Sequence, residues 1–77
     1  MTALPTTQRT VRGRLVLSRG EVILITPNNY NVLIADTWQK PLKYFIGELV
    51  EIECDLVEIN RIPQEIEQVY SCVFLES

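Results

Sequence analysis

Histidine is absent from this chain of 77 residues, and glycine, cysteine and aromatic residues are few. Without histidine, the chain lacks the commonest metal ligand and the commonest acid–base side chain at neutral pH. The glycines, Gly13, Gly20 and Gly47, are dispersed and form no phosphate-binding loop. General acid–base catalysis by two carboxyl groups needs one of them in a desolvated pocket, and nothing in the sequence indicates such a pocket. We therefore expect no enzymatic activity, no cofactor and no metal site.

The only two cysteines are Cys54 and Cys72. A zinc site needs four ligands, and one chain without histidine cannot supply them. Neither cysteine lies in a Cys-x-x-Cys motif or beside a base, which argues against redox chemistry. We expect two buried free thiols, and the alternative is a disulfide between neighbouring strands.

Long apolar runs are also missing. The longest nearly apolar stretch, residues 21–26, is far shorter than the roughly 20 residues that span a membrane. The first residues lack the basic start and apolar segment of a signal peptide. We expect a cytoplasmic protein with reduced cysteines, without a membrane partner and without a small-molecule substrate.

What the chain does contain is β-forming sequence, since 47% of its residues are hydrophobic and no long helical period occurs. At this length roughly 60% of the surface can be buried, enough for one core. We predict an all-β fold, with residues 1–9 as a flexible N-terminal tail and 10–77 as a single β-barrel domain. The predicted strands are 10–17, 21–26, 30–36, 48–57 and 69–75.

Proline and glycine mark the connections between these strands. Between the third and fourth strands we predict a short helix or turn, with Pro41 at its first position and Gly47 at its end. Residues 60–64 are predicted to be a loop, because Pro63 cannot donate a hydrogen bond to a strand ladder.

Turn chemistry predicts which side chains face the core. Residues 27–30 fit a hairpin with a two-residue turn, and residues 18–20 fit a three-residue loop with a bulge. A two-residue turn at residues 19–20 would instead shift the first strand by one residue. The predicted core set is Leu15, Ile23, Ile25, Val32 and Ile34. The predicted outer set is Arg12, Arg14, Val16, Val22, Leu24, Leu33 and Ala35.

This hairpin carries apolar side chains on both faces, whereas a strand with one wet face normally alternates. The strand at 48–57 does alternate: Val50, Ile52, Cys54 and Leu56 point one way, and Glu51, Glu53 and Asp55 the other. If this strand pairs with the last one about a centre near Pro63, Cys54 lies directly opposite Cys72.

The order of these elements, with Ile46-Gly47-Glu48-Leu49-Val50 leading into the fourth strand, resembles a compact OB-fold barrel. The resemblance covers about residues 10–76 and implies a ligand face on the second and third strands, bordered by two loops. The implied positions are Val22, Leu24, Leu33, Ala35, Arg19, Asn60 and Arg61. An SH3-like barrel is the alternative.

Charge is unevenly distributed, with a net +4 over residues 1–46 and −7 over residues 47–77. Arginines in the first half could contact nucleic-acid phosphates. In an OB topology, however, the first strand lies beside the fourth, where Arg12 and Arg14 would meet Glu51, Glu53 and Asp55. Such cross-strand pairs contribute roughly 0.2–1 kcal/mol each and would cancel the basic patch.

Two functional hypotheses result. The first is a small non-catalytic adaptor that self-associates or binds a protein partner through an apolar barrel wall, since monomers generally avoid such patches. Its residues are Val16, Val22, Leu24, Leu33 and Trp38, although for Trp38 a role in capping the barrel is favoured over a partner contact. The second hypothesis is binding of single-stranded nucleic acid, as in other OB-like barrels. Its residues are Arg12, Arg14, Arg19 and Arg61.

Overall fold

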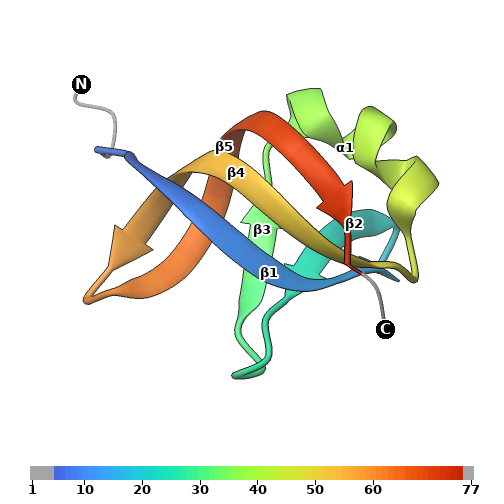
Figure 1. The fold of residues 1–77 in the computed structure, drawn as a ribbon, viewed down its shortest axis with the longest axis horizontal. Coiled ribbons are helices and arrows are strands. Elements are labelled where there is room, and N and C mark those ends of the chain that lie inside the picture. Colours follow the sequence, from blue (N-terminus) through green and yellow to red (C-terminus); the bar gives the residue numbers. More distant parts are fainter. Residues whose placement is uncertain (1–4, 76–77) are drawn as a thin grey trace.

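The computed structural model describes residues 5–75 and folds them into five strands, one short α-helix and a 3₁₀ turn (Figure 1). The elements are β1 (Thr7–Ser18), β2 (Glu21–Ile25), β3 (Asn31–Ile34), α1 (Asp36–Leu42), η1 (Lys43–Phe45), β4 (Leu49–Ile59) and β5 (Ile62–Phe74). The predicted tail is too long, because Thr7–Arg9 pair with β4 as part of β1. Its residues 1–4 lie outside the described part of the chain.

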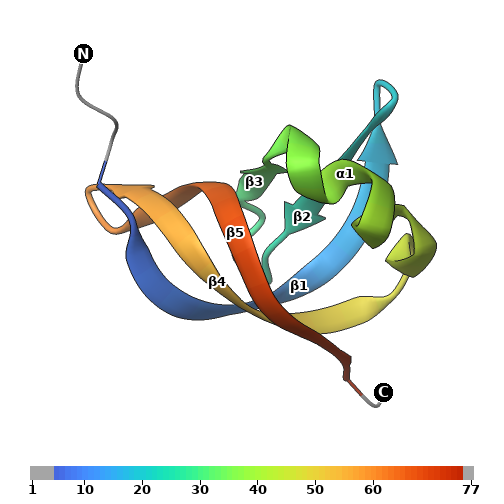
Figure 2. The same cartoon turned by 90° about the horizontal axis from the view of Figure 1, so that it is seen from above.

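The strands close into a barrel in the order β1-β2-β3-β5-β4 (Figures 1 and 2). Every neighbouring pair is antiparallel except β3 and β5, which run parallel. The prediction of an all-β, five-stranded barrel with a short helix between the third and fourth strands is confirmed. This architecture is compatible with an OB-like small barrel. Neither helical segment of residues 5–75 is long enough to cross a membrane.

The core fills the inside of the barrel and is entirely apolar among its buried side chains. Its members are Leu15, Val22, Leu24, Val32, Ile34, Leu42, Val50, Ile52, Cys54, Leu56, Ile66 and Val69. Gly13 lies where β1 passes from β4 to β2, and a Cβ atom there would collide with the carbonyl oxygen of Ile25. The absence of a side chain at this position therefore allows β1 to bend tightly over β2.

The lengths of the two hairpin loops are exchanged relative to the prediction: the β1–β2 loop has two residues and the β2–β3 loop has three. Arg19 and Gly20 form a two-residue turn with positive φ at both positions, and Ser18 pairs with Glu21. The β2–β3 loop instead has three residues, because the Thr26 N–H donates to the Tyr30 carbonyl across 3.0 Å. Asn29 takes the left-handed conformation in this loop, with φ of 67°, as a bulged loop of this length requires.

These loop lengths invert the predicted orientation of β2. Val22 and Leu24 point into the core, and Leu24 is 0% exposed, so their assignment to the outer face is wrong. Ile23 and Ile25 lie on the outer face instead. The one-residue errors at the two loops cancel, and the predicted inward orientation of Leu15, Val32 and Ile34 is therefore correct.

The β4–β5 hairpin is longer than predicted. Asn60 and Arg61 form a tight turn with positive φ, and β5 begins at Ile62, so Pro63 belongs to the ladder rather than to a loop. Because β3 pairs with β5 only at Glu65 and Ile66, Pro63 lies at a sheet edge, where a missing N–H is tolerated. Three register shifts follow along the hairpin.

Those shifts move the two cysteines apart. Cys54 pairs with Val69, and Cys72 pairs with Ile52, so the predicted direct opposition of the cysteines is wrong. Both thiols are free, with Cys54 buried and Cys72 half-buried. The inward orientation of alternate β4 residues is confirmed, since Val50, Ile52, Cys54 and Leu56 all belong to the core.

The helix α1 covers one end of the barrel through Leu42 and Trp38. It begins at Asp36, so Pro41 lies near its C-terminal end. The prediction that Pro41 occupies the first position of the helix is therefore wrong. Gly47, with φ of 90°, ends the helical segment two residues after η1. A glycine is favoured there because left-handed backbone carries no penalty without a Cβ atom.

Candidate docking surface on the outer face of β1, β2 and β3

The outer face of β1, β2 and β3 carries aliphatic side chains that do not belong to the core cluster inside the barrel. We call this set the outer strip, and its members are Val16, Ile23, Ile25 and Leu33. Val16 pairs with Ile23 across β1 and β2. Leu33 is 50% exposed, whereas Ile23 is 8% exposed and is covered by its neighbours. Because both sides of β2 are apolar, burying one side leaves the other facing outward.

A shallow groove of about 320 Å³ opens beside the outer strip. Its floor contains Val16 and Ile25 from the outer strip and Leu49 from β4. The β2–β3 loop forms one wall, and Arg14 stands at the opposite side. The complete lining is Gly13, Arg14, Val16, Ile25, Thr26, Pro27, Asn29 and Leu49. The outer face therefore combines an aliphatic floor with a polar rim.

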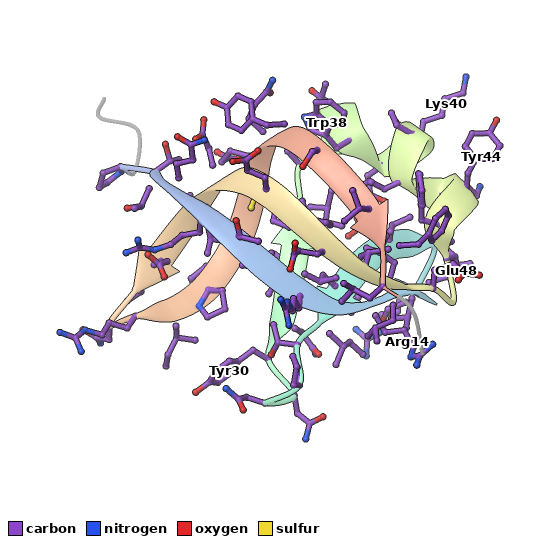
Figure 3. All side chains as sticks on the ribbon, viewed as in Figure 1. Arg14, Tyr30, Trp38, Lys40, Tyr44 and Glu48 are labelled. Carbon is purple, nitrogen blue, oxygen red and sulfur yellow. The ribbon has the colours of Figure 1, made fainter. Side chains whose placement is uncertain are left out.

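The predicted partner-binding residues divide into two groups. Val16 and Leu33 lie on the outer strip, whereas Val22 and Leu24 are buried in the core and are not available for a partner. Trp38 projects from α1 (Figure 3) and packs against the core. Its indole N–H donates to the side-chain oxygen of Gln68 across 3.3 Å. This placement fits the capping role that we considered for Trp38.

The predicted cross-strand pairing of arginines with carboxylates holds for Arg12. Its Nε donates to the Glu51 carboxylate across 2.7 Å, between strands that lie side by side. Arg9 makes a similar contact of 3.3 Å with Glu58. Arg14 differs, since its guanidinium donates to the Gly47 carbonyl across 2.6 Å and no carboxylate of residues 5–75 pairs with it.

The remaining two predicted basic residues, Arg19 and Arg61, lie in the turns at opposite ends of the long axis of the molecule (Figures 1 and 2). The molecule measures 39 Å along this axis. The four arginines Arg12, Arg14, Arg19 and Arg61 consequently form no single basic patch.

Negative charge gathers on the other side of the outer strip. Glu65 lies opposite Leu33 across the β3–β5 pair. Desolvation, followed by the charge and hydrogen bond of Glu67 and the charge of Asp36, raises the pKa of the Glu65 carboxyl above its ordinary value. The outer strip is therefore bordered by Arg14 on β1 and by an acidic group on β5.

Both thiols are held in their neutral form by burial. Burial, and secondarily the charge of Asp55, raises the pKa of the Cys54 thiol to about 11, which disfavours the nucleophilic thiolate. Burial also raises the pKa of the Cys72 thiol. Within residues 5–75, no group of three or more His, Cys, Asp or Glu side chains is placed to hold a metal ion.

One structurally important side chain, Gln39, escaped the sequence analysis. Its amide nitrogen donates to the carbonyl oxygens of Val22 and Ile34 across 2.9 and 3.1 Å. Its amide oxygen accepts the Val22 N–H across 2.7 Å. Gln39 thus bridges β2 and β3 beyond the last residues that pair directly. No periodicity or motif marks such a glutamine, because its partners are backbone groups distant in the sequence.

Comparison of the chain with protein-family models, with curated protein sequences and with solved structures finds no match.

Proposed function

We propose that this chain is a small, non-catalytic protein–protein interaction module that pairs with a second copy of itself through the outer strip. The observation that carries the proposal is that β2 is apolar on both sides. After Val22 and Leu24 have entered the core, Ile23, Ile25 and their neighbours still cover the outer face. Of this aliphatic set, Leu33 is 50% exposed and Val16 and Ile25 are half-buried, and aliphatic surface left open to solvent is typical of an interaction site.

Charge around the outer strip supports a second copy as the occupant. In a closed dimer with twofold symmetry, each surface meets its own twin. A twofold axis parallel to β2 and through the centre of the outer strip would place the β1 side of one copy over the β5 side of the other. Arg14, which has no carboxylate partner among the described residues, would then approach the Glu65 carboxylate of the second copy. Complementary charges of this kind favour one orientation over others.

The test is the mass of the protein in solution, measured by light scattering from micromolar to millimolar concentrations. The wild type should reach twice the mass of one chain. Leu33→Lys places a charge on the outer strip and should raise the dissociation constant at least about tenfold, since one well-placed interface residue contributes more than 1.4 kcal/mol.

The matched control is Val73→Lys. Val73 is 48% exposed on β5 and lies opposite Glu51, just as Leu33 lies opposite Glu65. Each lysine therefore enters a similarly exposed strand position beside a glutamate, and only one of them is on the outer strip. A wild type that stays monomeric throughout, or equal dissociation by both variants, would overturn the proposal.

Binding of single-stranded nucleic acid is less well supported by the arrangement of the arginines. Arg12 is engaged by Glu51, and Arg19 and Arg61 lie far apart, whereas single-strand binders combine a continuous basic groove with stacking aromatics. Fluorescence anisotropy with a short labelled oligothymidylate at low salt tests this alternative, because electrostatic affinity is strongest there. Binding that is lost in Arg14→Ala would favour the alternative over self-association.

A further inference from the structure

A second concave surface lies away from the outer strip, between the β1–β2 turn and the helical segment α1–η1. It is a cleft of about 470 Å³, within the range of about 300–1,000 Å³ that is usual for ligand sites. The lining residues are Leu17, Gly20, Val22, Gln39, Lys40, Lys43 and Tyr44. In Figure 3 the side chains of Lys40 and Tyr44 project from the same end of the molecule.

The floor of this cleft is aliphatic. Leu17 and Val22 are direct partners across β1 and β2, and Leu17 is exposed although it belongs to the inward side of β1. Gly20 leaves the mouth of the cleft open, since a Cβ atom built there meets nothing within 4 Å. Leu17 therefore presents apolar surface that a ligand side chain can cover, whereas Val22 is buried.

The rim of the cleft is basic, although the chain as a whole carries a net charge of −3. Lys40 and Lys43 are exposed three positions apart on one helical segment, so their side chains emerge on the same face. Neither ammonium group pairs with a carboxylate of residues 5–75. Arg19 adjoins Gly20 in the turn and adds positive charge, while Glu21 on its other side is the nearest acidic residue in the sequence.

Two further features suit the cleft for binding. Tyr44 is 85% exposed, the highest value among the large hydrophobic residues of residues 5–75, and its ring borders the cleft. Gln39 joins the two walls through its three hydrogen bonds to Val22 and Ile34. Because these bonds hold α1 against the β1–β2 hairpin, the cleft needs little rearrangement to accept a ligand, which lowers the entropic cost of binding.

We propose that this cleft binds an acidic peptide segment of a partner protein, in which an aliphatic side chain lies next to a carboxylate. The aliphatic side chain covers Leu17, which is 52% exposed, and the carboxylate lies between the ammonium groups of Lys40 and Lys43. The Tyr44 ring packs along the peptide. Lysine ammonium groups act as point charges and bind a carboxylate without a fixed bidentate geometry.

A nucleotide is a poorer fit to this surface. Stacking platforms for single strands use several aromatic rings that receive successive bases, and Tyr44 is the one aromatic residue in the lining. The hydrogen-bonding groups of Gln39 are already occupied by backbone partners. An aliphatic floor instead favours a leucine or isoleucine side chain.

The experiment is an NMR titration of the full-length chain, labelled with ¹⁵N, with the capped peptide acetyl-Leu-Glu-Leu-Glu-amide. Amide shifts should move at Gly20, Lys40 and Tyr44, and the double variant Lys40→Ala/Lys43→Ala should weaken binding about tenfold, as expected for two partly exposed charge contacts. Arg61→Ala, which removes a cation at the other end of the barrel, is the control and should leave the affinity unchanged.

Three outcomes would overturn the proposal: an absence of shifts around the cleft at millimolar peptide, equal binding of a peptide in which glutamine replaces glutamate, or shifts at the cleft with oligothymidylate alone. The proposal is independent of self-association through the outer strip. Leu33→Lys should therefore dissociate the dimer and leave peptide binding unchanged, so that failure of one proposal is distinguished from failure of the other.

Discussion

The barrel has two outer faces that differ in kind. The face over β1, β2 and β3 is aliphatic along the outer strip, whereas the face over β1, β4 and β5 carries charged side chains, some of which pair with one another, beside exposed residues such as Val73. On the charged face Arg12 contacts Glu51, and the Tyr70 hydroxyl donates to the Asp55 carboxylate across 2.7 Å. Side chains whose charges already pair within one chain gain little free energy from contact with a partner. Exposed aliphatic side chains do gain free energy when a partner buries them.

The two faces also differ in how strongly the sequence determines strand orientation. In β4, apolar residues alternate with Glu51, Glu53 and Asp55, and turning the strand over would bury three carboxylates at high cost. In β2, both sides are aliphatic, so turning it over exchanges one apolar set for another. Loop conformation then decides which set is inside.

The largest expected effect tests which side of β2 and β3 faces the core. Leu24→Ala should lower the free energy of unfolding by about 2–5 kcal/mol, because it removes a fully buried side chain and leaves a cavity. Leu33→Ala should cost less than about 1 kcal/mol, since half of that side chain is already in water. Urea denaturation of both variants measures the difference, and a larger loss at Leu33 would reverse the faces described above.

A smaller effect is expected from the pairing on the charged face. A double-mutant cycle with Arg12→Ala and Glu51→Ala should give a coupling energy of about 0.2–1 kcal/mol, because the pair is exposed and partly screened. The coupling should fall when salt is added. A second cycle with Arg61→Ala and Glu51→Ala serves as the control. If both cycles give the same coupling, the Arg12–Glu51 contact does not stabilise the charged face.

The smallest effect concerns Glu65, at the border of the two faces. Its pKa in the folded chain is raised above the ordinary value of 4.5, so the folded state holds this proton more tightly than the unfolded state. Its contribution to stability is therefore present at low pH and is lost as the pH rises through the raised pKa.

At a protein concentration low enough to keep the chain monomeric, Glu65→Gln should accordingly match the wild type below pH 4.5 and be slightly more stable above the raised pKa, as followed by urea denaturation across this pH range. A wild type that gains stability relative to Glu65→Gln as the pH rises would show that the Glu65 carboxylate has a favourable partner.

The predicted orientations of the side chains on the first three strands are correct in part, and the errors have a common cause. The excess of apolar residues on the 21–36 hairpin correctly indicated an aliphatic outer face, and Val16 and Leu33 are on it. Val22 and Leu24 were misplaced because asparagine and glycine turns fit both two- and three-residue loops. The cleft residues Lys40, Lys43 and Tyr44 gave no sequence signal, since the cleft exists only where α1 packs against a distant hairpin.

Composition and alternation by themselves determined an all-β fold and the inward side of β4. The barrel and the pairing of Arg12 on β1 with β4 were expected from the resemblance of the element order to an OB-fold. The inward side of β4 follows from the free-energy cost of burying charged side chains, which depends only on the residues of that strand. Only the tertiary structure decided the orientation of β2, the shifted register that separates Cys54 from Cys72, and the bridge made by Gln39. Each of these depends on loop conformation or on backbone partners far away in the sequence, and side-chain patterning carries no information about either.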